Sequence, residues 1–346
     1  MTAHVLRPRT VLGDHKVTTA EIADDVSRHH ADHPRLRAIL RVIGNSGVQT
    51  RHFTRPLDSP TVSGTADVGE RARTAFGDAL AMAERAATGA LDDAGLAARD
   101  IDAIVTTHTT SWAVPHLDIN LVSRLGLRPD LRRVALATVA CTGGTQALAR
   151  AADLVAARPG SKVLVVAAEV LSSIYHHSDT TIESMIYKAL FGDAAAATIV
   201  TDTPLGPGLA VEDTFEYVLP DSVERQRGRI STDGIHFDST KQVLAAVTDV
   251  LPPLLEWLGP RRPDFALIHP GSPRIIADTT DALRLDEHAA RHSTDTLSHE
   301  GNLGGVSILR VLERTHADPP HDGAHGAAVA FGPGFATAAA RCRWQA

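Results

Sequence analysis

Residues 139–169 read VACTGGTQALARAADLVAARPGSKVLVVAAE, and this stretch decides the fold class. After Cys141, apolar residues recur at helical spacing up to Val155, and Pro159-Gly160 lies beyond the expected end of that helix. The continuous apolar run Val163–Ala168 is typical of a strand covered on both faces, as in a parallel sheet. A helix that leads into such a strand indicates an α/β fold.

The preceding residues predict the same kind of unit. A second buried strand is expected within Ile101–Thr107. Before it, apolar residues from Ala79 to Leu91 recur at helical spacing, and Gly95 is expected to end that helix. The order of helix, strand, helix and strand again favours an α/β sheet.

The second half of the chain repeats this order of elements. A helix over Val243–Leu258 is expected to lead to a strand at 265–268, and the glycine-rich turn 301–305 precedes another helix around Ile308–Leu312. Cys141 and Asn302 then occupy matching turn-to-helix junctions. Such a repeat predicts two similar halves that face each other, which we divide into residues 1–205 and 206–346.

Composition excludes several classes of protein. The 346 residues are 43% apolar and 22% charged, as expected of a globular enzyme. The net charge of -7 argues against nucleic acid as the main partner. No run of about 18 apolar residues exists, so no membrane span is expected. The start of the chain does not resemble a signal peptide and the two cysteines do not suggest a disulfide framework, so we expect a cytoplasmic protein.

The histidines raise the question of a metal site. The chain has 18 of them, and the tightest group lies within Arg28–His33, a polar stretch followed by Pro34. We expect this group to be solvated surface, and the same holds for His316, His321 and His325 in a segment rich in Pro, Gly and Asp. No metal site is predicted.

Cys141 is the first candidate for chemistry. It stands where a turn ends and a helix begins, and Gly143-Gly144 permits a tight turn and close approach of the backbone. The positive end of the helix dipole favours the thiolate of a cysteine in this place. The exposed N–H groups there can also stabilise the oxyanion of a thioester intermediate. The local sequence is equally compatible with a buried, inert cysteine.

His269 and Asn302 are the other candidates. His269 follows the expected strand 265–268, and working groups of α/β enzymes stand at the carboxyl ends of parallel strands. A hydrogen-bonded surface histidine would give the same pattern. Asn302 lies between Gly301 and Leu303, where a turn residue in the left-handed region would also fit.

These residues belong to an ordered series of short motifs. The series is CTGG at 141–144, VLVVAAE at 163–169, LFGDAAAA at 190–197, HPGSP at 269–273, GNLGG at 301–305 and FGPG at 331–334. It resembles the bacterial type III polyketide synthases, the chalcone-synthase-like branch of the thiolase superfamily, from about Leu6 to Gly334. Each glycine motif is a weak signal alone, whereas HPGxP with a late FGPG is specific to this branch.

The resemblance implies a thiolase-like, duplicated αβαβα fold with five layers, a homodimer, and a Cys-His-Asn triad. By motif match, Cys141 is the nucleophile that carries the growing chain. His269 pairs with the thiolate and, with Asn302, donates hydrogen bonds to the malonyl thioester carbonyl. The implied substrates are acyl-CoA and malonyl-CoA, with no other cofactor.

The resemblance also implies residues around the substrate. Phe191 and Phe237 match the two phenylalanines that gate the family's cavity. Thr109 or Thr110 stands where tetrahydroxynaphthalene synthases carry a cysteine. Other expected pocket residues are Leu171, Ile174, Tyr187, Gly228 and Gly304, the last in place of a bulkier residue of the usual motif. Arg51 is expected to contact CoA, and Val114, before a cis Pro115, to enter the partner's cavity.

The predicted function is that of a type III polyketide synthase. Because Leu171 and Ile174 replace threonines of plant chalcone synthases, we expect an aliphatic starter, two or three extensions, and an alkylresorcinol or alkylpyrone product. One alternative is a tetrahydroxynaphthalene-type synthase that uses malonyl-CoA alone. Another is a ketosynthase III or a related acyltransferase that passes on an acyl group without extension.

Overall fold

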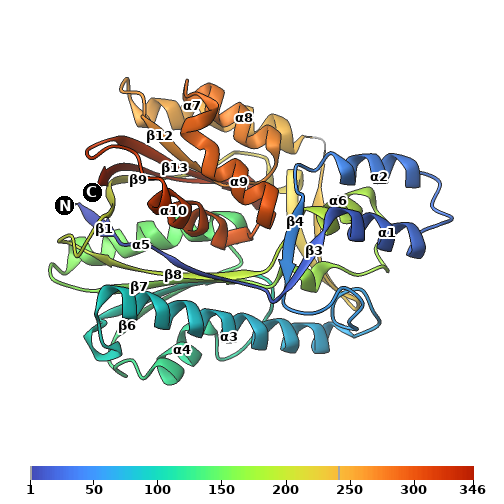
Figure 1. Cartoon of the computed structure of the whole chain (residues 1–346), viewed down its shortest axis with the longest axis horizontal. Coiled ribbons are helices and arrows are strands. Elements are labelled where there is room, and N and C mark those ends of the chain that lie inside the picture. The colour runs from blue at the N-terminus through green and yellow to red at the C-terminus, as the bar shows by residue number, and fades with distance from the viewer. Residues whose placement is uncertain (1, 241) are drawn as a thin grey trace.

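A sheet of ten strands runs through the computed structural model, which describes residues 2–240 and 242–346 (Figure 1). Nine strands follow the order β12-β13-β14-β9-β1-β8-β7-β5-β6, and β2 pairs with β8. The strands are β1 (Ala3–Val5), β2 (Arg9–Leu12), β5 (Ala103–His108), β6 (Arg132–Ala137), β7 (Val163–Glu169), β8 (Ala194–Thr201), β9 (Gly208–Val218), β12 (Phe265–Ile268), β13 (His325–Gly332) and β14 (Ala336–Gln345).

Two hairpins lie outside this sheet, and helices cover it. The hairpins are β3 (His15–Thr18) with β4 (Thr50–Phe53) and β10 (Gln226–Ser231) with β11 (Gly234–Ser239). The α-helices are α1 (Thr19–His29), α2 (Leu36–Gly44), α3 (Val68–Ala94), α4 (Leu117–Leu125), α5 (Gly143–Ala157), α6 (Ile182–Leu190), α7 (Val243–Leu258), α8 (Pro273–Ala282), α9 (Arg291–Glu300) and α10 (Ser307–Ala317).

Strand pairing repeats between the two halves. In the first half β5 runs parallel to β6 and β7, and β7 pairs antiparallel with β8. In the second half β12 runs parallel to β13, which pairs antiparallel with β14. The duplication predicted from the order of elements is therefore present in the strand directions. The division at residue 205 falls in the turn between β8 and β9 and stays a prediction.

Five layers follow from which helices share a core with which strands (Figure 1). α3 and α4 pack on the outer face of β5, β7 and β8. α7 and α8 pack on the outer face of β12 and β13. Between the two halves of the sheet, α5 and α10 bury Leu148, Val155, Leu309 and Leu312 against strands of both halves. Each such side chain stabilises the fold by about 1.5–3 kcal/mol, so this central layer anchors the predicted αβαβα arrangement.

The expected elements agree with the observed ones apart from their ends. The strand expected within Ile101–Thr107 is β5, and the run Val163–Ala168 is β7. Gly95 ends α3 with φ of 64°, a left-handed conformation that glycine adopts without strain. Among the described residues, no helix combines the length and the apolar character needed to cross a bilayer.

Candidate active site

A strained turn presents Cys141. The residue lies in a short 3-10 turn, Ala140–Thr142, between the end of β6 and the start of α5. Thr138 and Ala140 have φ of 61° and 48°, a left-handed conformation that costs an L-residue about 1–2 kcal/mol. The Thr109 hydroxyl oxygen accepts a hydrogen bond of 3.0 Å from the Ala140 N–H. Thr109 therefore helps to hold the turn that carries the thiol.

The two central helices approach so closely that glycine is required where they meet. A Cβ added to Gly144, at the start of α5, would clash with the carbonyl oxygen of Gly305. A Cβ on Gly305 would lie 3.0 Å from the carbonyl oxygen of Ala140. Because neither side chain is present, the segment before α10 lies directly against the turn of Cys141. This contact places Asn302 beside the thiol.

Backbone hydrogen bonds fix the position of Asn302. Its N–H donates to the carbonyl of Leu190 at 2.8 Å, and its carbonyl accepts from Gly192 at 3.1 Å. The side-chain Oδ1 accepts from the Gly304 N–H at 2.9 Å, which directs the amide Nδ2 toward Cys141. Nδ2 and the Cys141 Sγ are 4.0 Å apart. The amide can donate to the sulfur or to a group bound on it.

His269 stands at the carboxyl end of β12. Its backbone N–H donates to Val329 at 2.8 Å, and the residue is buried. Both ring nitrogens lack a hydrogen-bond partner within the described part of the chain. An unsatisfied buried imidazole is unusual in a folded protein, and it indicates groups that a bound molecule can use. Burial lowers the pKa of His269 to about 3, so the ring is neutral in the free enzyme.

Burial also governs the thiol. It raises the pKa of Cys141 to about 12, although a hydrogen bond from Asn302 opposes the change. The sequence led us to expect that the start of a helix would favour thiolate. In this turn desolvation outweighs that effect, so the Cys141 thiol and the His269 imidazole are each neutral.

A small chamber lies around the sulfur. It is narrow in this conformation, with a cavity volume of about 20 Å³. Its lining includes six residues that the sequence predicted for the site: Thr109, Cys141, Leu171, Phe191, Phe237 and Gly304. Thr110, the alternative to Thr109, is instead buried and accepts a hydrogen bond from Val170. The predicted pocket thus gathers residues from both halves of the chain.

The other predicted pocket residues lie around Phe191 and Phe237, the two phenylalanines that are predicted to gate the cavity. The rings of Phe191 and Phe237 have centroids 6.1 Å apart, and Tyr187 stacks on Phe191 with centroids 5.2 Å apart. Gly228 pairs with Phe237 across the β10–β11 hairpin, and its missing side chain leaves room for that ring. Ile174 is buried in the cluster that includes Phe191. These three residues support the chamber rather than line it.

Sequence reasoning missed four lining residues: Ala140, Glu169, Gln226 and Pro333. Glu169 is the most informative of them, because it ends β7 and is buried. Its Oε2 accepts from the N–H groups of Thr109 and Thr110, both at 3.1 Å, and burial raises the pKa of the carboxyl to about 7. An acidic residue directly after a buried parallel strand was the available signal.

Arg51 requires a correction. Its side chain is fully buried, and its guanidinium donates to the carbonyl of Ala189 and to the hydroxyl of Thr19 at 2.9 Å. A CoA phosphate in solvent cannot reach the guanidinium in this conformation. The predicted CoA contact is therefore wrong for this arrangement, and Arg51 ties β4 to α1 and α6.

Val114 lies at the surface of the single chain. The Val114–Pro115 bond is cis, as predicted. The Val114 side chain is 79% exposed and nearby Trp112 is 77% exposed. Large apolar groups exposed together are typical of a surface that another molecule covers.

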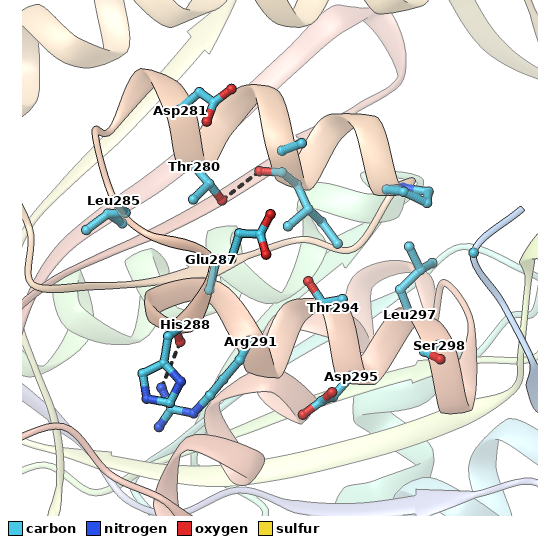
Figure 2. A pocket seen from close by; sticks show the side chains of 15 residues that line it. Thr280, Asp281, Leu285, Glu287, His288, Arg291, Thr294, Asp295, Leu297 and Ser298 are labelled. Atoms are coloured by element: carbon cyan, nitrogen blue, oxygen red, sulfur yellow. Dashed lines mark hydrogen bonds between the residues drawn. The ribbon is translucent and has the colours of Figure 1, made fainter.

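A wide surface hollow is separate from the thiol. Figure 2 shows it between α8 and α9, with the carboxylates of Asp281, Glu287 and Asp295 and the guanidinium of Arg291 around it. Three carboxylates against one guanidinium disfavour the phosphates of CoA at this place. The hollow contains none of the proposed triad.

Together, the fold and the site define a class of protein. A thiol beside a donor amide, in a mostly apolar chamber at the centre of a duplicated α/β fold, is suited to hold an acyl group as a thioester. Family models of chalcone and stilbene synthases match this chain, the N-terminal domain over residues 3–204 and the C-terminal domain over residues 210–342.

Individual proteins agree with the family models. A 1,3,6,8-tetrahydroxynaphthalene synthase of Streptomyces coelicolor is 32% identical, over 99% of this chain and 92% of the relative. A phloroglucinol synthase of Pseudomonas fluorescens is 30% identical, over 98% of both chains. The structure of germicidin synthase from Streptomyces coelicolor, a type III polyketide synthase, is 30% identical and superimposes with a TM-score of 0.94 over 99% of this chain and 100% of that one.

The chain belongs to the chalcone and stilbene synthase family and is a type III polyketide synthase with a thiolase-like fold. It is an acyltransferase that condenses CoA-linked starters with malonyl-CoA by decarboxylation. This membership sets aside the alternative of acyl transfer without extension.

Proposed function

We propose that Cys141 carries the starter and the growing chain as a thioester. The sulfur lines the chamber, and the start of α5 lies directly behind it. In the loading step Sγ gives its proton to the neutral His269 and attacks the acyl-CoA carbonyl. The bond between that carbonyl and the CoA sulfur then breaks, and CoA leaves as its thiol with the proton from His269.

His269 acts again, now together with Asn302, when malonyl-CoA binds. The bond to the carboxylate breaks, carbon dioxide leaves, and the electron pair forms an enolate on the malonyl thioester. A ring N–H of His269 and the Asn302 amide donate hydrogen bonds to the enolate oxygen as charge develops there. The enolate carbon attacks the thioester on Cys141, and the Cys141 sulfur leaves. The free nitrogens of His269 and the directed amide of Asn302 support these roles.

The starter proposed for this enzyme is an aliphatic acyl-CoA. The observation that carries this proposal is the chamber lining, where Leu171, Phe191, Phe237 and Pro333 present apolar surface. Each methylene buried against such surface contributes about 0.8 kcal/mol. The chamber is narrow in this conformation, which favours a medium-length chain over a long one. In the proposed reaction the starter is then extended two or three times and cyclised to an alkylresorcinol or alkylpyrone.

A synthase that starts from malonyl-CoA is the second candidate. It is supported by the 32% identity with a tetrahydroxynaphthalene synthase and by Thr109 and Gln226 in the lining. Polar side chains at these two places suit a starter with polar atoms. The two candidates differ in the product made from malonyl-CoA as sole substrate.

The test compares octanoyl-, palmitoyl-, coumaroyl- and malonyl-CoA as sole starters with isotopically labelled malonyl-CoA. We expect octanoyl-CoA to give the highest kcat/KM and pyrone or resorcinol products by mass spectrometry. Preference for malonyl- or coumaroyl-CoA would exclude the aliphatic starter. Leu171→Thr should lower kcat/KM for octanoyl-CoA about tenfold, because it removes apolar contact. Leu205→Thr, at an exposed turn, is the matched control and should leave it unchanged.

A further inference from the structure

A cluster of histidines surrounds a buried carboxylate at α1. The sequence predicts the run Arg28–His33 as solvated surface, and this is wrong for His30, which is only 8% exposed. Folding brings this part of α1 against Tyr175 and His177, from the segment that follows a 3-10 turn at Leu171–Ile174. None of these side chains has a role in the polyketide chemistry derived above.

Asp25 is the centre of this cluster. It is buried, and its Oδ2 accepts a hydrogen bond of 2.7 Å from the Tyr175 hydroxyl. The His177 Nε2 lies 3.0 Å from Oδ2, and the His29 Nδ1 lies 3.2 Å from Oδ1. One ligand atom from each of Asp25, His29 and His177 can be chosen so that all three lie within 4.8 Å of one another.

A second shell of contacts orients the cluster. The His177 Nδ1 lies 2.9 Å from the His30 Nε2, so one ring can donate to the other. The rings of His29 and His177 are stacked with centroids 3.8 Å apart, so the His29 ring has to turn before both rings can direct a nitrogen at one ion. A histidine that binds metal through one nitrogen usually donates its other N–H to a neighbour, which fixes the tautomer and the ring orientation. His30 stands where such a neighbour is needed.

Two features of the cluster suit the binding of a cation. The His177 Nε2 is buried and makes no hydrogen bond of ordinary geometry with the described residues, although it faces Asp25. The Arg28 guanidinium approaches Asp25 at 3.3 Å, but its side chain is 71% exposed, so solvent screens this ion pair. A buried carboxylate with imidazole nitrogens directed at it is an arrangement that a divalent cation completes.

We propose that Asp25, His29 and His177 bind a divalent transition-metal ion, Zn²⁺ above all, with water as the fourth ligand. One carboxylate and two imidazoles suit Zn²⁺, whereas Mg²⁺ and Ca²⁺ prefer oxygen ligands alone. In a tetrahedral site with bonds of about 2.0–2.1 Å, ligand atoms stand about 3.3 Å apart. The His177 Nε2 lies 3.0 Å from Oδ2, close to this value. The His29 Nδ1 lies 3.2 Å from the other oxygen, Oδ1, and 3.0 Å from the backbone carbonyl of Asp25, so the exposed His29 ring has to turn to complete the set.

The ion would cross-link parts of the chain that are distant in sequence. It would join α1 to the segment after Leu171–Ile174, and Leu171 lines the chamber of Cys141. A bound ion stabilises only the folded state, because the unfolded chain does not hold these ligands together.

The direct test measures metal content. Protein without a histidine tag is stripped with EDTA, dialysed against Zn²⁺ and analysed by inductively coupled plasma mass spectrometry. We expect one Zn²⁺ per chain. Asp25→Asn and His177→Gln should each lose it, and His30→Gln should weaken binding about 10- to 100-fold. His33→Gln is the matched control from the same histidine-rich run and should keep the ion.

The thiol of Cys141 is an alternative ligand, so Cys141→Ala belongs to the same experiment and should retain one Zn²⁺ per chain. Loss of the ion in Cys141→Ala, or its retention in His177→Gln, would overturn the proposal. A measurement that needs no variant at the site is Co²⁺ binding to Cys141→Ala. The visible absorption of tetrahedral Co²⁺ is expected, and its absence would also overturn the proposal.

Discussion

The Asn302 amide nitrogen lies 4.0 Å from the Cys141 sulfur, although 161 residues separate them in the chain. The Gly304 N–H donates a hydrogen bond to the amide oxygen of Asn302, and this orients Nδ2 toward the thiol. The contact exists because Gly144, at the start of α5, meets Gly305, in the turn before α10, without intervening side chains. Mutations can therefore separate what the amide does from what the sulfur does.

Asn302→Ala should separate loading from decarboxylation. It removes a donor to the enolate oxygen but leaves Cys141 and His269 in place, so acylation by a starter should continue. Release of carbon dioxide from malonyl-CoA should fall about 100- to 1000-fold, the usual effect of losing one such donor. His269→Ala should impair both steps, and Asn45→Ala, at the exposed end of α2, should impair neither. Normal decarboxylation by Asn302→Ala would contradict this division of roles.

Cys141→Ala should abolish covalent loading, while Cys342→Ala should not. Cys342 is fully buried in β14, where its sulfur donates to the carbonyl of Ala340 at 3.3 Å, and burial raises the pKa of its thiol to about 12. Intact-protein mass spectrometry after incubation with octanoyl-CoA measures the adduct. One acyl group is expected on the wild type and on Cys342→Ala. An adduct that persists on Cys141→Ala would refute the nucleophile assignment.

Much of the fold was predictable from the sequence because the central strands are buried on both faces. Such strands need continuous apolar residues, and β7 and β12 have them. The turn-to-helix junctions of Cys141 and Asn302 were also predictable, because glycines mark them. The strands and the turn-to-helix junctions are each marked by residues close together in the chain, so a single sequence is enough to predict them.

What could not be predicted depends on contacts between distant segments. The sequence predicts a solvated His30 and a CoA contact for Arg51, yet tertiary packing buries both side chains. The buried carboxylate of Glu169 becomes part of the site only because Thr109 and Thr110 turn their N–H groups toward it. No local pattern distinguishes such residues from exposed ones.

Glu169→Gln should change how stability depends on pH. Burial raises the pKa of Glu169 from 4.5 to about 7 in the folded chain. The folded state therefore holds the proton more tightly, and the resulting stability is complete below about pH 4.5 and lost as pH rises to about 7. The loss amounts to about 3 kcal/mol at most. Glu169→Gln removes the titrating group, so the stability of the variant does not fall in this way. The melting temperature of Glu169→Gln minus that of the wild type should therefore rise between about pH 4.5 and 7 and then stay constant.

Glu300→Gln is a control of opposite sign. Burial alone would raise the pKa of Glu300, but Arg310 and Arg314 reverse this and hold the pKa below its usual value. This carboxylate stabilises the fold above its unfolded pKa, so Glu300→Gln should be less stable than wild type at neutral pH. Scanning calorimetry between about pH 5 and 8 measures both variants. A constant difference between Glu169→Gln and wild type would show that Glu169 does not titrate in this range.

The enzyme should be a homodimer that covers Trp112 and Val114. Both are large, apolar and mostly exposed in the single chain. Val114→Asp would bury a carboxylate without a partner, which costs several kcal/mol, so the dimer should weaken by more than about tenfold. Sedimentation velocity over a concentration series measures this, with Leu205→Asp as the control on an exposed turn. A wild type that is monomeric at all concentrations would refute the expected dimer.

Gly304→Ala should narrow the chamber and shift the enzyme toward smaller starters. Gly304 has φ of 58°, and a Cβ there would lie 3.2 Å from the Cγ of Glu169 and 3.3 Å from the Cδ1 of Leu171. These contacts are tighter than ordinary packing, so Leu171 must move into the space that a starter would fill. We expect kcat/KM for octanoyl-CoA to fall about tenfold relative to that for acetyl-CoA, with a loss of about 1–2 kcal/mol in stability from the backbone conformation.

Gly95→Ala separates the two effects, because Gly95 has a similar φ of 64° but no atom within 4 Å of an added Cβ among the described residues. Its stability should fall by a similar amount, since the backbone strain is the same, while its starter preference should not change. Thermal melts and starter competition, read by product mass spectrometry, measure the two quantities. If Gly304→Ala keeps the wild-type preference, or if Gly95→Ala alters it equally, Gly304 does not set the size of the chamber.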